Sequence, residues 1–307
     1  MKRLLLADRV KTEADSFLAP LLPALRAVYD VRFVSLPPGP ALAEAIGWAD
    51  IVWLEWCWDH AVWATREVLA GKPCIVRLHS IEALQTDYPG RVDWSRVSVL
   101  VTVSEDTAGV MRSRFPAIRV PVAVIPNGID MQRFRLGAPD PFRIAWVGHL
   151  EPKKNPMLML QIAQRLRFFD PRFQVFVAGA VTDLRTIRYL RHVRSVMGLD
   201  DAVRFEGHVT DMPAWYADKG VLLSTSLYES FGMNIGEAMA TGAFPVVHCF
   251  PGAEALWPAE CLFASVDDAV VLIRSARMGA YRDWVADRYG LDRQVREVLA
   301  LLEDRMP

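Results

Sequence analysis

The residues best suited to chemistry lie between Glu229 and Glu237 of this chain of 307 residues. The two carboxylates flank an aromatic–glycine turn that leads into a predicted helix at 235–240. A loop carboxylate can accept hydrogen bonds from sugar hydroxyls, and the free N–H groups at 232–234, at a helix start, can hold phosphate oxygens. This pattern predicts a site for a polyhydroxylated ligand that carries phosphate. The alternative is a pair of solvated surface charges.

A second segment with chemical potential, 147–156, joins a predicted strand to a predicted helix. Gly148 permits close approach of a ligand to the backbone. His149, Lys153 and Lys154 place positive charge at the carboxyl end of the strand, where a lysine can donate charge-assisted hydrogen bonds to a diphosphate. The alternative is a solvated basic turn.

The composition is that of a packed globular protein, with 52% hydrophobic and 23% charged residues. A net charge of −1 argues against a dedicated nucleic-acid binder. The cysteines are scattered, without a C-x-x-C motif, and are expected to be buried free thiols in a reducing cytosol. They are Cys57, Cys74, Cys249 and Cys261. No acidic cluster suggests a metal site, and no cofactor is expected.

No segment approaches the roughly 18 uninterrupted apolar residues that a membrane span needs. The segment 1–8 has two basic residues and a short apolar run, but the run is too short for a signal peptide and is interpreted as a first buried strand. We therefore expect a cytoplasmic protein.

Short apolar runs alternate with amphipathic stretches along the whole chain, a pattern typical of doubly wound parallel α/β sheets. Strands are expected at 4–7, 31–36, 51–55, 74–79, 97–103, 122–125, 142–147, 173–178, 203–205, 221–224 and 244–247. Helices are expected at 61–70, 105–115, 156–169, 183–197, 212–216, 235–240 and 293–303.

The linker-like composition at 136–141 predicts a domain boundary. We expect an N-terminal domain at 1–139 and a C-terminal domain at 140–307, with the last helix packing back on the first domain. Both are expected to be Rossmann-like and to face each other across a cleft, with ligands at the carboxyl ends of their strands.

Four segments together resemble the family-4 retaining glycosyltransferases of GT-B fold. They are Val-Ser-Glu at 103–105, Ile-Pro-Asn-Gly-Ile-Asp-Met-Gln-Arg-Phe at 125–134, the loop 147–156, and Glu-Ser-Phe-Gly-Met-Asn-Ile-Gly-Glu-Ala-Met-Ala-Thr-Gly at 229–242. The last segment is the most specific. The resemblance extends over roughly residues 101–250.

The resemblance implies that the N-terminal domain, 1–139, is the acceptor side and that the C-terminal domain, 140–307, binds the nucleotide sugar. It also implies roles for individual residues. Glu229 would meet the hydroxyls of the transferred sugar, Glu237 would bind the nucleotide ribose, and Lys154 would neutralise the leaving diphosphate. The remaining donor-binding positions are implied at Gly148, Val209, Phe231, Gly232, Met233 and Asn234. His79, at the end of a first-domain strand, would face the donor sugar; the alternative is a structural histidine.

Two positions depart from the family pattern. His149 stands where the family normally has arginine, and histidine offers less positive charge at neutral pH. The first loop, 8–13, lacks the glycines often found there.

Arginines at 185, 188, 191 and 194 recur along one predicted helix. They form a solvated face or, alternatively, a contact with anionic lipid or a polyanionic partner.

The expected function is transfer of a sugar from a nucleotide-diphosphate donor to an acceptor hydroxyl with retention, in glycan, glycolipid or polysaccharide synthesis. The expected partners are the donor and a glycan, lipid-linked or small-molecule acceptor, with a peripheral membrane contact as an option. The alternatives are a catalytically silent sugar-nucleotide binder and another enzyme of the same fold, such as an epimerase. A nicotinamide-dependent oxidoreductase is disfavoured because no G-x-G-x-x-G follows the first strand.

Overall fold

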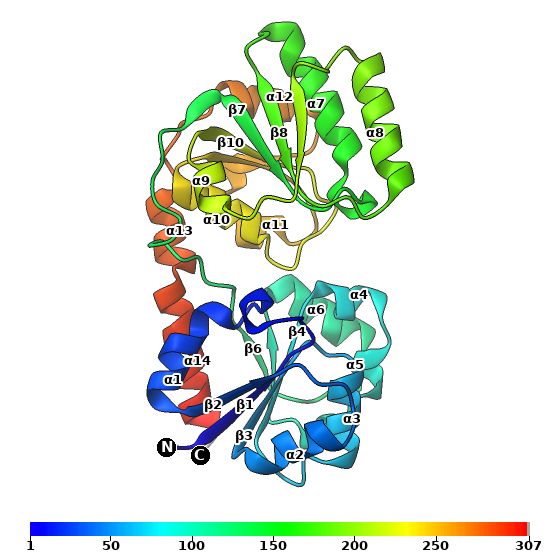
Figure 1. The fold of residues 1–307 in the computed structure, drawn as a ribbon, viewed down its shortest axis with the longest axis vertical. Helices are drawn as coiled ribbons and strands as arrows, with labels where there is room; N and C mark the ends of the chain where they lie inside the picture. Colours follow the sequence, from blue (N-terminus) through cyan, green and yellow to red (C-terminus); the bar gives the residue numbers. More distant parts are fainter. Residues whose placement is uncertain (306–307) are drawn as a thin grey trace. The chain divides into compact units, whose positions relative to one another are not determined.

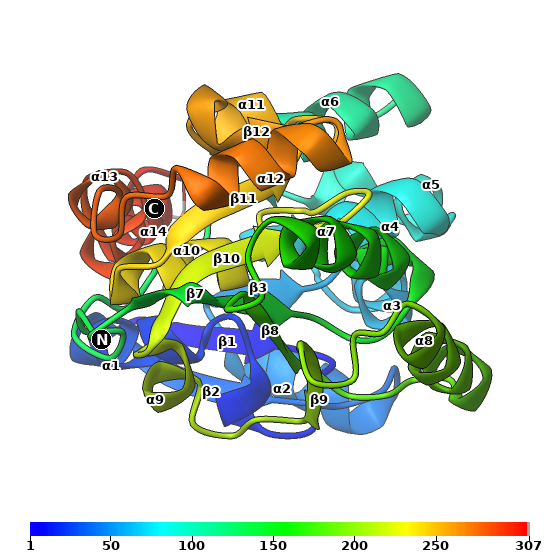
Figure 2. The same ribbon diagram turned by 90° about the horizontal axis from the view of Figure 1, so that it is seen from above.

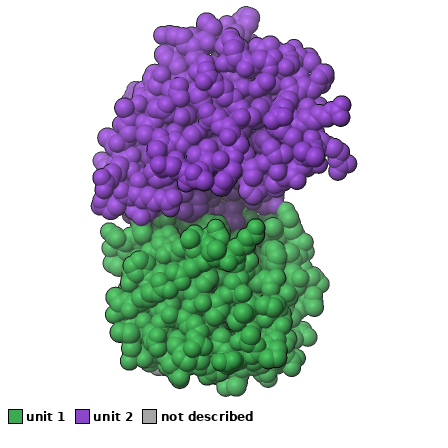
Figure 3. Space-filling view, viewed as in Figure 1, with its two compact units in different colours: residues 1–128, 291–307 green, residues 129–290 purple. Residues whose placement is uncertain are grey.

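The computed structural model describes residues 1–305, which form two compact units (Figures 1 and 3). Unit 1 comprises residues 1–128 together with 291–307, of which the last two lie outside the described part, and unit 2 comprises residues 129–290. The sequence predicted the division between residues 139 and 140; the units separate between Gly128 and Ile129, and the C-terminal segment belongs to unit 1.

Unit 1 contains a six-stranded parallel sheet with the order β2-β1-β3-β4-β5-β6. The strands are β1 (Arg3–Ala7), β2 (Asp30–Val34), β3 (Ile51–Glu55), β4 (Cys74–Leu78), β5 (Val99–Thr102) and β6 (Val122–Val124). The helices are α1 (Leu22–Val28), α2 (Pro40–Trp48), α3 (Asp59–Glu67), α4 (Ser80–Gln85), α5 (Tyr88–Arg91), α6 (Glu105–Arg114) and α14 (Leu291–Arg305).

Two cores cover the two faces of the unit 1 sheet, because alternate residues of each strand point to opposite sides. Leu5 and Leu54 face a core shared with helices α2, α3, α4 and α6. Leu4 and Trp53 face a core shared with α1 and α14, which contributes Val298 and Leu302. Burial on both faces explains why these strands are almost continuously hydrophobic.

Unit 2 repeats the plan with the order β12-β11-β10-β7-β8-β9, again all parallel. The strands are β7 (Asp140–Val147), β8 (Gln174–Ala178), β9 (Val203–Gly207), β10 (Lys219–Ser224), β11 (Phe244–His248) and β12 (Leu262–Phe263). The helices are α7 (Pro156–Phe169), α8 (Leu184–Val196), α9 (Met212–Tyr216), α10 (Met233–Thr241), α11 (Ala253–Leu256), α12 (Val266–Arg274) and α13 (Arg282–Tyr289).

Helices α7, α8 and α12 share one core with the unit 2 sheet, and α7 and α12 lie side by side (Figure 2). Helix α10 packs instead with α9 and α13. The order of the strands reverses between β7 and β10. Strands β8 and β9 extend the sheet on one side of β7, whereas β10, β11 and β12 extend it on the other side. In open α/β sheets such a switch point is where ligands bind, beyond the carboxyl ends of the strands.

The predicted doubly wound α/β class is confirmed for both units. Every predicted strand is present, several with shifted ends, and the two-residue β12 was not predicted. Cys57, Cys74 and Cys261 are buried free thiols, as expected, whereas Cys249 is exposed. Among residues 1–305, no helix combines the length and the apolar character needed to cross a bilayer.

Candidate active site at the switch point of unit 2

The loops that follow β7 and β10 are tied together by hydrogen bonds. The Leu227 N–H donates to the Lys153 carbonyl at 2.8 Å. The Thr225 hydroxyl donates to the Lys154 carbonyl at 2.7 Å and accepts from the Trp146 indole N–H at 2.9 Å. Because Thr225 and Trp146 are almost fully buried, these bonds fix the two loops against each other.

An ion pair lies where the two loops meet. The Lys154 ammonium donates to Oε1 of Glu229, and the Lys153 ammonium lies 3.9 Å from Oε2 of the same carboxylate. The Ser226 hydroxyl donates to Glu229 Oε1 at 2.7 Å. Glu229 is 8% exposed, so its charge is held by these partners rather than by water. Two ammonium groups and one carboxylate leave a net positive charge, which favours an anionic ligand.

Lys153 differs from its neighbour. Burial lowers the pKa of Lys153, opposed by the attraction of Glu229. Its ammonium lies 4.7 Å from the ring centroid of Tyr228, in a cation–π contact. Lys154 makes the closer contact with the Glu229 carboxylate, and the ammonium of Lys153 adds a second positive charge beside it.

Glycine allows the backbone to approach closely at this edge of the sheet. A Cβ on Gly148 would lie 3.0 Å from the aliphatic part of Lys154, and one on Gly179 would lie 1.9 Å from the Gly148 carbonyl oxygen. The β7–α7 loop then enters α7 through Asn155, whose side-chain oxygen accepts from the Leu158 N–H at 3.4 Å. The predicted amide cap followed by proline at 156 is confirmed.

Helix α10 begins directly after the Glu229 loop. Gly232 caps it at φ +94°, a left-handed conformation that favours glycine. The first N–H groups of a helix lack intrahelical partners, so those of Met233 and Asn234 are suited to phosphate oxygens. The Asn234 amide donates to the Val147 carbonyl at 3.1 Å, which ties the start of α10 to the end of β7.

Glu237 lies one turn further along α10 and is partly buried. Burial raises its pKa to about 7, against the opposing attraction of Arg133. A carboxyl group that is half ionised near neutral pH can serve as a hydrogen-bond partner for a ribose diol. Arg133, from the Pro-Asn-Gly segment, was not among the predicted site residues.

The other predicted residues of unit 2 have different surroundings. Phe231 is buried in an aromatic cluster with Trp257 and Tyr289, so only its backbone is suited to ligand binding. His149 is exposed in the β7–α7 loop. Val209 follows the edge strand β9 and is partly buried, with β8 between β9 and β7.

His79, the predicted site residue of unit 1, belongs to a buried polar network. Its Nε2 lies 3.0 Å from Glu55 Oε1, and the Arg77 guanidinium donates to the same oxygen at 3.0 Å. Arg77 also donates to the Asn127 side-chain oxygen. Burial alone would raise the pKa of Glu55, but Arg77 and His79 hold it below its ordinary value. The His79 ring lies 4.3 Å from the Trp56 ring centroid.

Sequence reasoning missed Ser226 and the Glu55–Arg77–Asn127 network. Charged residues inside the apolar strands β3 and β4 were the available signal, because a buried charge needs a partner. Asp8 lies in the first loop, 8–13, which differs from the family pattern. It is also buried, and it accepts hydrogen bonds from the Ser16 hydroxyl and the Arg9 N–H. Burial raises the pKa of Asp8.

Two family models match consecutive parts of the chain. Residues 14–133 match "Glycosyltransferase Family 4", and residues 141–274 match "Glycosyl transferases group 1". Together the two matches indicate a glycosyltransferase, and the two parallel α/β units have the GT-B fold. The chain belongs to the family-4 glycosyltransferases, as the four sequence segments predicted.

Among curated relatives, a D-inositol 3-phosphate glycosyltransferase of Geodermatophilus obscurus is 34% identical over 167 residues, 48% of this chain and 37% of the relative. The GDP-mannose:cellobiosyl-diphosphopolyprenol alpha-mannosyltransferase of Xanthomonas campestris is 27% identical over 233 residues, 70% of this chain and 60% of the relative. The matched segments thus span less than two thirds of these relatives.

Solved structures share the fold at low sequence identity. HepE of Anabaena, in complex with UDP and glucose, gives a TM-score of 0.76 at 14% identity, covering 99% of this chain and 100% of that one. Sucrose-phosphate synthase of Thermosynechococcus elongatus gives a TM-score of 0.74 at 15% identity, covering 98% of each chain.

Proposed function

We propose that the protein is a retaining glycosyltransferase that moves a sugar from a nucleotide-diphosphate donor to an acceptor hydroxyl. The observation that carries this proposal is the Lys154–Glu229 pair, held with Ser226 beside the start of α10. It brings a cation, a hydroxyl-binding carboxylate and a helix N-terminus to the ligand-binding edge of one sheet. A diphosphate-linked sugar needs these three groups together.

In this proposal the donor diphosphate takes over Lys154 and the N–H groups at the start of α10. Its negative charge displaces the carboxylate from the ammonium, and Glu229 is then free to accept hydrogen bonds from the sugar hydroxyls. Glu237 binds the ribose, and His149 contacts the leaving diphosphate. Membership of the glycosyltransferase family and the relatives named above support a sugar-nucleotide donor.

The acceptor oxygen forms a bond to the anomeric carbon while the bond from that carbon to the phosphate oxygen breaks. The acceptor proton passes to the departing phosphate, which leaves as part of a nucleoside diphosphate. Lys154 and the α10 N–H groups stabilise the charge that develops on this leaving group. Removing one such donor from an enzyme typically lowers kcat by about 10²–10³-fold. No residue is assigned as a general base.

The test is a turnover screen of UDP-, GDP- and ADP-sugars. The first acceptors are D-inositol 3-phosphate and polyprenol-diphosphate-linked cellobiose, since relatives are named for these compounds. Product analysis by NMR should show the anomeric configuration of the donor. Nucleotide-sugar binding without transfer across a broad acceptor panel would support a silent binder instead. Conversion of the donor sugar without an acceptor would support an epimerase.

A further inference from the structure

Helix α8 presents an unusual outward surface in unit 2. Its thirteen residues include four arginines and no aspartate or glutamate, although the chain as a whole carries a net charge of −1. The inward face is apolar, with Ile187 and Leu190 buried in the core. The outward face carries more than charge, because Leu184 is 81% exposed, Val196 72% and Tyr189 54%.

The exposed positions of α8 form one continuous surface. At 3.6 residues per turn they occupy roughly half of the helix circumference. We call them the α8 face: Leu184, Arg185, Arg188, Tyr189, Arg191, His192, Ser195 and Val196. It carries three arginines, at 185, 188 and 191, and three exposed apolar or aromatic side chains, at 184, 189 and 196. This mixture differs from an ordinary solvated face, in which the exposed side chains are polar.

The nearby acidic residues are already engaged at the two ends of the helix. Asp183 caps the N-terminus through the N–H groups of Arg185 and Thr186 and lies 3.6 Å from the Arg185 guanidinium. Asp200 pairs with Arg194, which is turned away from the α8 face and also donates to the Val203 carbonyl. The guanidinium groups of the central part of the face are therefore left to an external anion.

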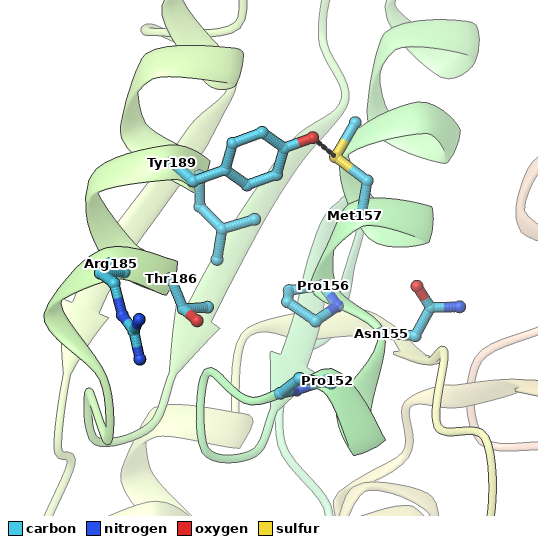
Figure 4. A pocket seen from close by; sticks show the side chains of 8 residues that line it. Pro152, Asn155, Pro156, Met157, Arg185, Thr186 and Tyr189 are labelled. Atoms are coloured by element: carbon cyan, nitrogen blue, oxygen red, sulfur yellow. Dashed lines mark hydrogen bonds between the residues drawn. The ribbon is translucent and has the colours of Figure 1, made fainter.

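An apolar groove of about 430 Å³ borders the α8 face (Figure 4). It lies between α8 and the start of α7, and Pro156, Met157 and Leu190 contribute to its lining. Tyr189 forms one wall, where its hydroxyl lies 3.7 Å from the Met157 sulfur. Arg185 also lines the groove, so a cationic group stands beside an apolar depression.

We propose that the α8 face is a docking surface for an anionic phospholipid bilayer. Charge complementarity carries the choice of partner, because arginine guanidinium groups bind phosphate and gather near anionic headgroups. The interleaved Leu184, Tyr189 and Val196 suit shallow insertion at the level where headgroups meet acyl chains. A soluble polyanion would match the charges but would leave these apolar side chains and the groove without a partner.

Flotation of the full chain with vesicles tests the proposal. We expect binding to vesicles of equal parts phosphatidylcholine and phosphatidylglycerol, weak binding to phosphatidylcholine alone, and loss of binding as salt is added. The triple variant Arg185→Gln/Arg188→Gln/Arg191→Gln should bind the anionic vesicles roughly 100-fold more weakly, given the usual contribution of each arginine near such a surface.

The matched control removes the same charge elsewhere, at exposed arginines on other segments: Arg112→Gln/Arg277→Gln/Arg296→Gln. It should bind like the unaltered chain. Should the α8 triple variant unfold at a lower temperature, Arg188→Gln/Arg191→Gln takes its place, since this pair leaves the Asp183 contact intact. A second readout uses a fluorophore at Val196→Cys in a Cys249→Ser background, compared with one at the exposed Ser275→Cys. Only the first should shift to shorter wavelength on anionic vesicles.

Three results would overturn the proposal. They are no binding by the unaltered chain, equal loss in the α8 and control variants, and binding of a soluble polyanion such as heparin with no fluorophore shift on vesicles. None of these measurements requires sugar transfer, so the proposed enzymatic function stands or falls separately.

Discussion

The Lys154 ammonium contacts the Glu229 carboxylate although the two residues are 75 positions apart in the sequence. The contact exists because β7 and β10 are neighbours in the sheet of unit 2, and their following loops meet at its carboxyl edge. The pair holds both side chains in place before any ligand arrives. A donor diphosphate must therefore displace the Glu229 carboxylate from the Lys154 ammonium, as the proposed function requires.

We expect Lys154→Ala and Glu229→Ala each to lower turnover at least about 100-fold, the scale of one lost transition-state charge partner. Glu229→Gln should retain part of the activity, because its amide keeps one acceptor oxygen. Steady-state kinetics with the donor found in the screen would measure this. Near-normal turnover in both alanine variants would remove the assigned roles. Arg204→Ala, an exposed arginine on β9, is the control.

His149→Arg should raise turnover at neutral pH by several-fold. Arginine restores the residue of the family pattern and can donate two parallel hydrogen bonds to a diphosphate, which histidine cannot do. Steady-state kcat/KM values of the two proteins at neutral pH give the comparison; equal values would exclude His149 from leaving-group stabilisation.

Binding of a nucleoside diphosphate should strengthen as the pH rises through about 7, because burial raises the pKa of Glu237 to that value and the ionised carboxylate is the better acceptor for ribose hydroxyls. Glu237→Gln should bind more weakly and lose this part of the pH dependence. Calorimetry on both proteins, below and above neutral pH, separates the contribution of Glu237 to this pH dependence from titration of the ligand phosphate. Equal affinity in the two proteins would contradict the assignment.

The same shift has a consequence for stability. The folded-state pKa of Glu237 lies above its ordinary value of 4.5, so the folded protein holds the proton more tightly than the unfolded chain. Its contribution to stability is full below about pH 4.5 and is lost as the pH rises to about 7. Glu237→Gln should therefore unfold with a flatter pH profile across that interval.

In unit 1, Arg77→Met should destabilise the protein by about 3–5 kcal/mol, because it leaves the fully buried Glu55 without its guanidinium partner. The same substitution in a Glu55→Gln background should cost much less, since no uncompensated charge remains. Urea unfolding of the four proteins of this cycle measures the difference. Equal costs in both backgrounds would show that the ion pair does not set the stability of the network.

Gly179→Ala should lower the melting temperature and weaken nucleotide binding together, because the new Cβ would collide with the Gly148 carbonyl and push the β7–α7 loop away. Gly109→Ala is the matched control: it lies in α6 with open space around it and should be neutral or slightly stabilising. Thermal melts and calorimetry are sufficient. A variant that melts and binds normally would mean that the loop tolerates the displacement.

The sequence predicted the strands well because burial on both faces makes each one an almost unbroken apolar run. It predicted α7 to the residue, since Asn155 and Pro156 mark its start by known rules. It could not predict that Glu55 meets Arg77, because that contact depends on the register of β3 against β4. Ser226 was missed for the same kind of reason: a lone serine in a loop carries no pattern of its own.

Candidate site residues that lie near each other in the sequence were the easiest to predict. The segment 229–237 brings its own turn, helix start and carboxylates, so local spacing indicates its chemistry. Val209 was placed by the resemblance, and its partial burial beyond the edge strand β9 leaves its role a prediction.

Helix α14 belongs to unit 1 but follows the whole of unit 2 in the chain. During synthesis on the ribosome, residues 129–290 emerge as one continuous stretch and can complete their core before translation ends. The hydrophobic face formed by Leu4 and Trp53 must wait for Val298 and Leu302. A nascent chain stalled before residue 291 would therefore display a sheet face that α1 covers only in part, the kind of surface on which chaperones act.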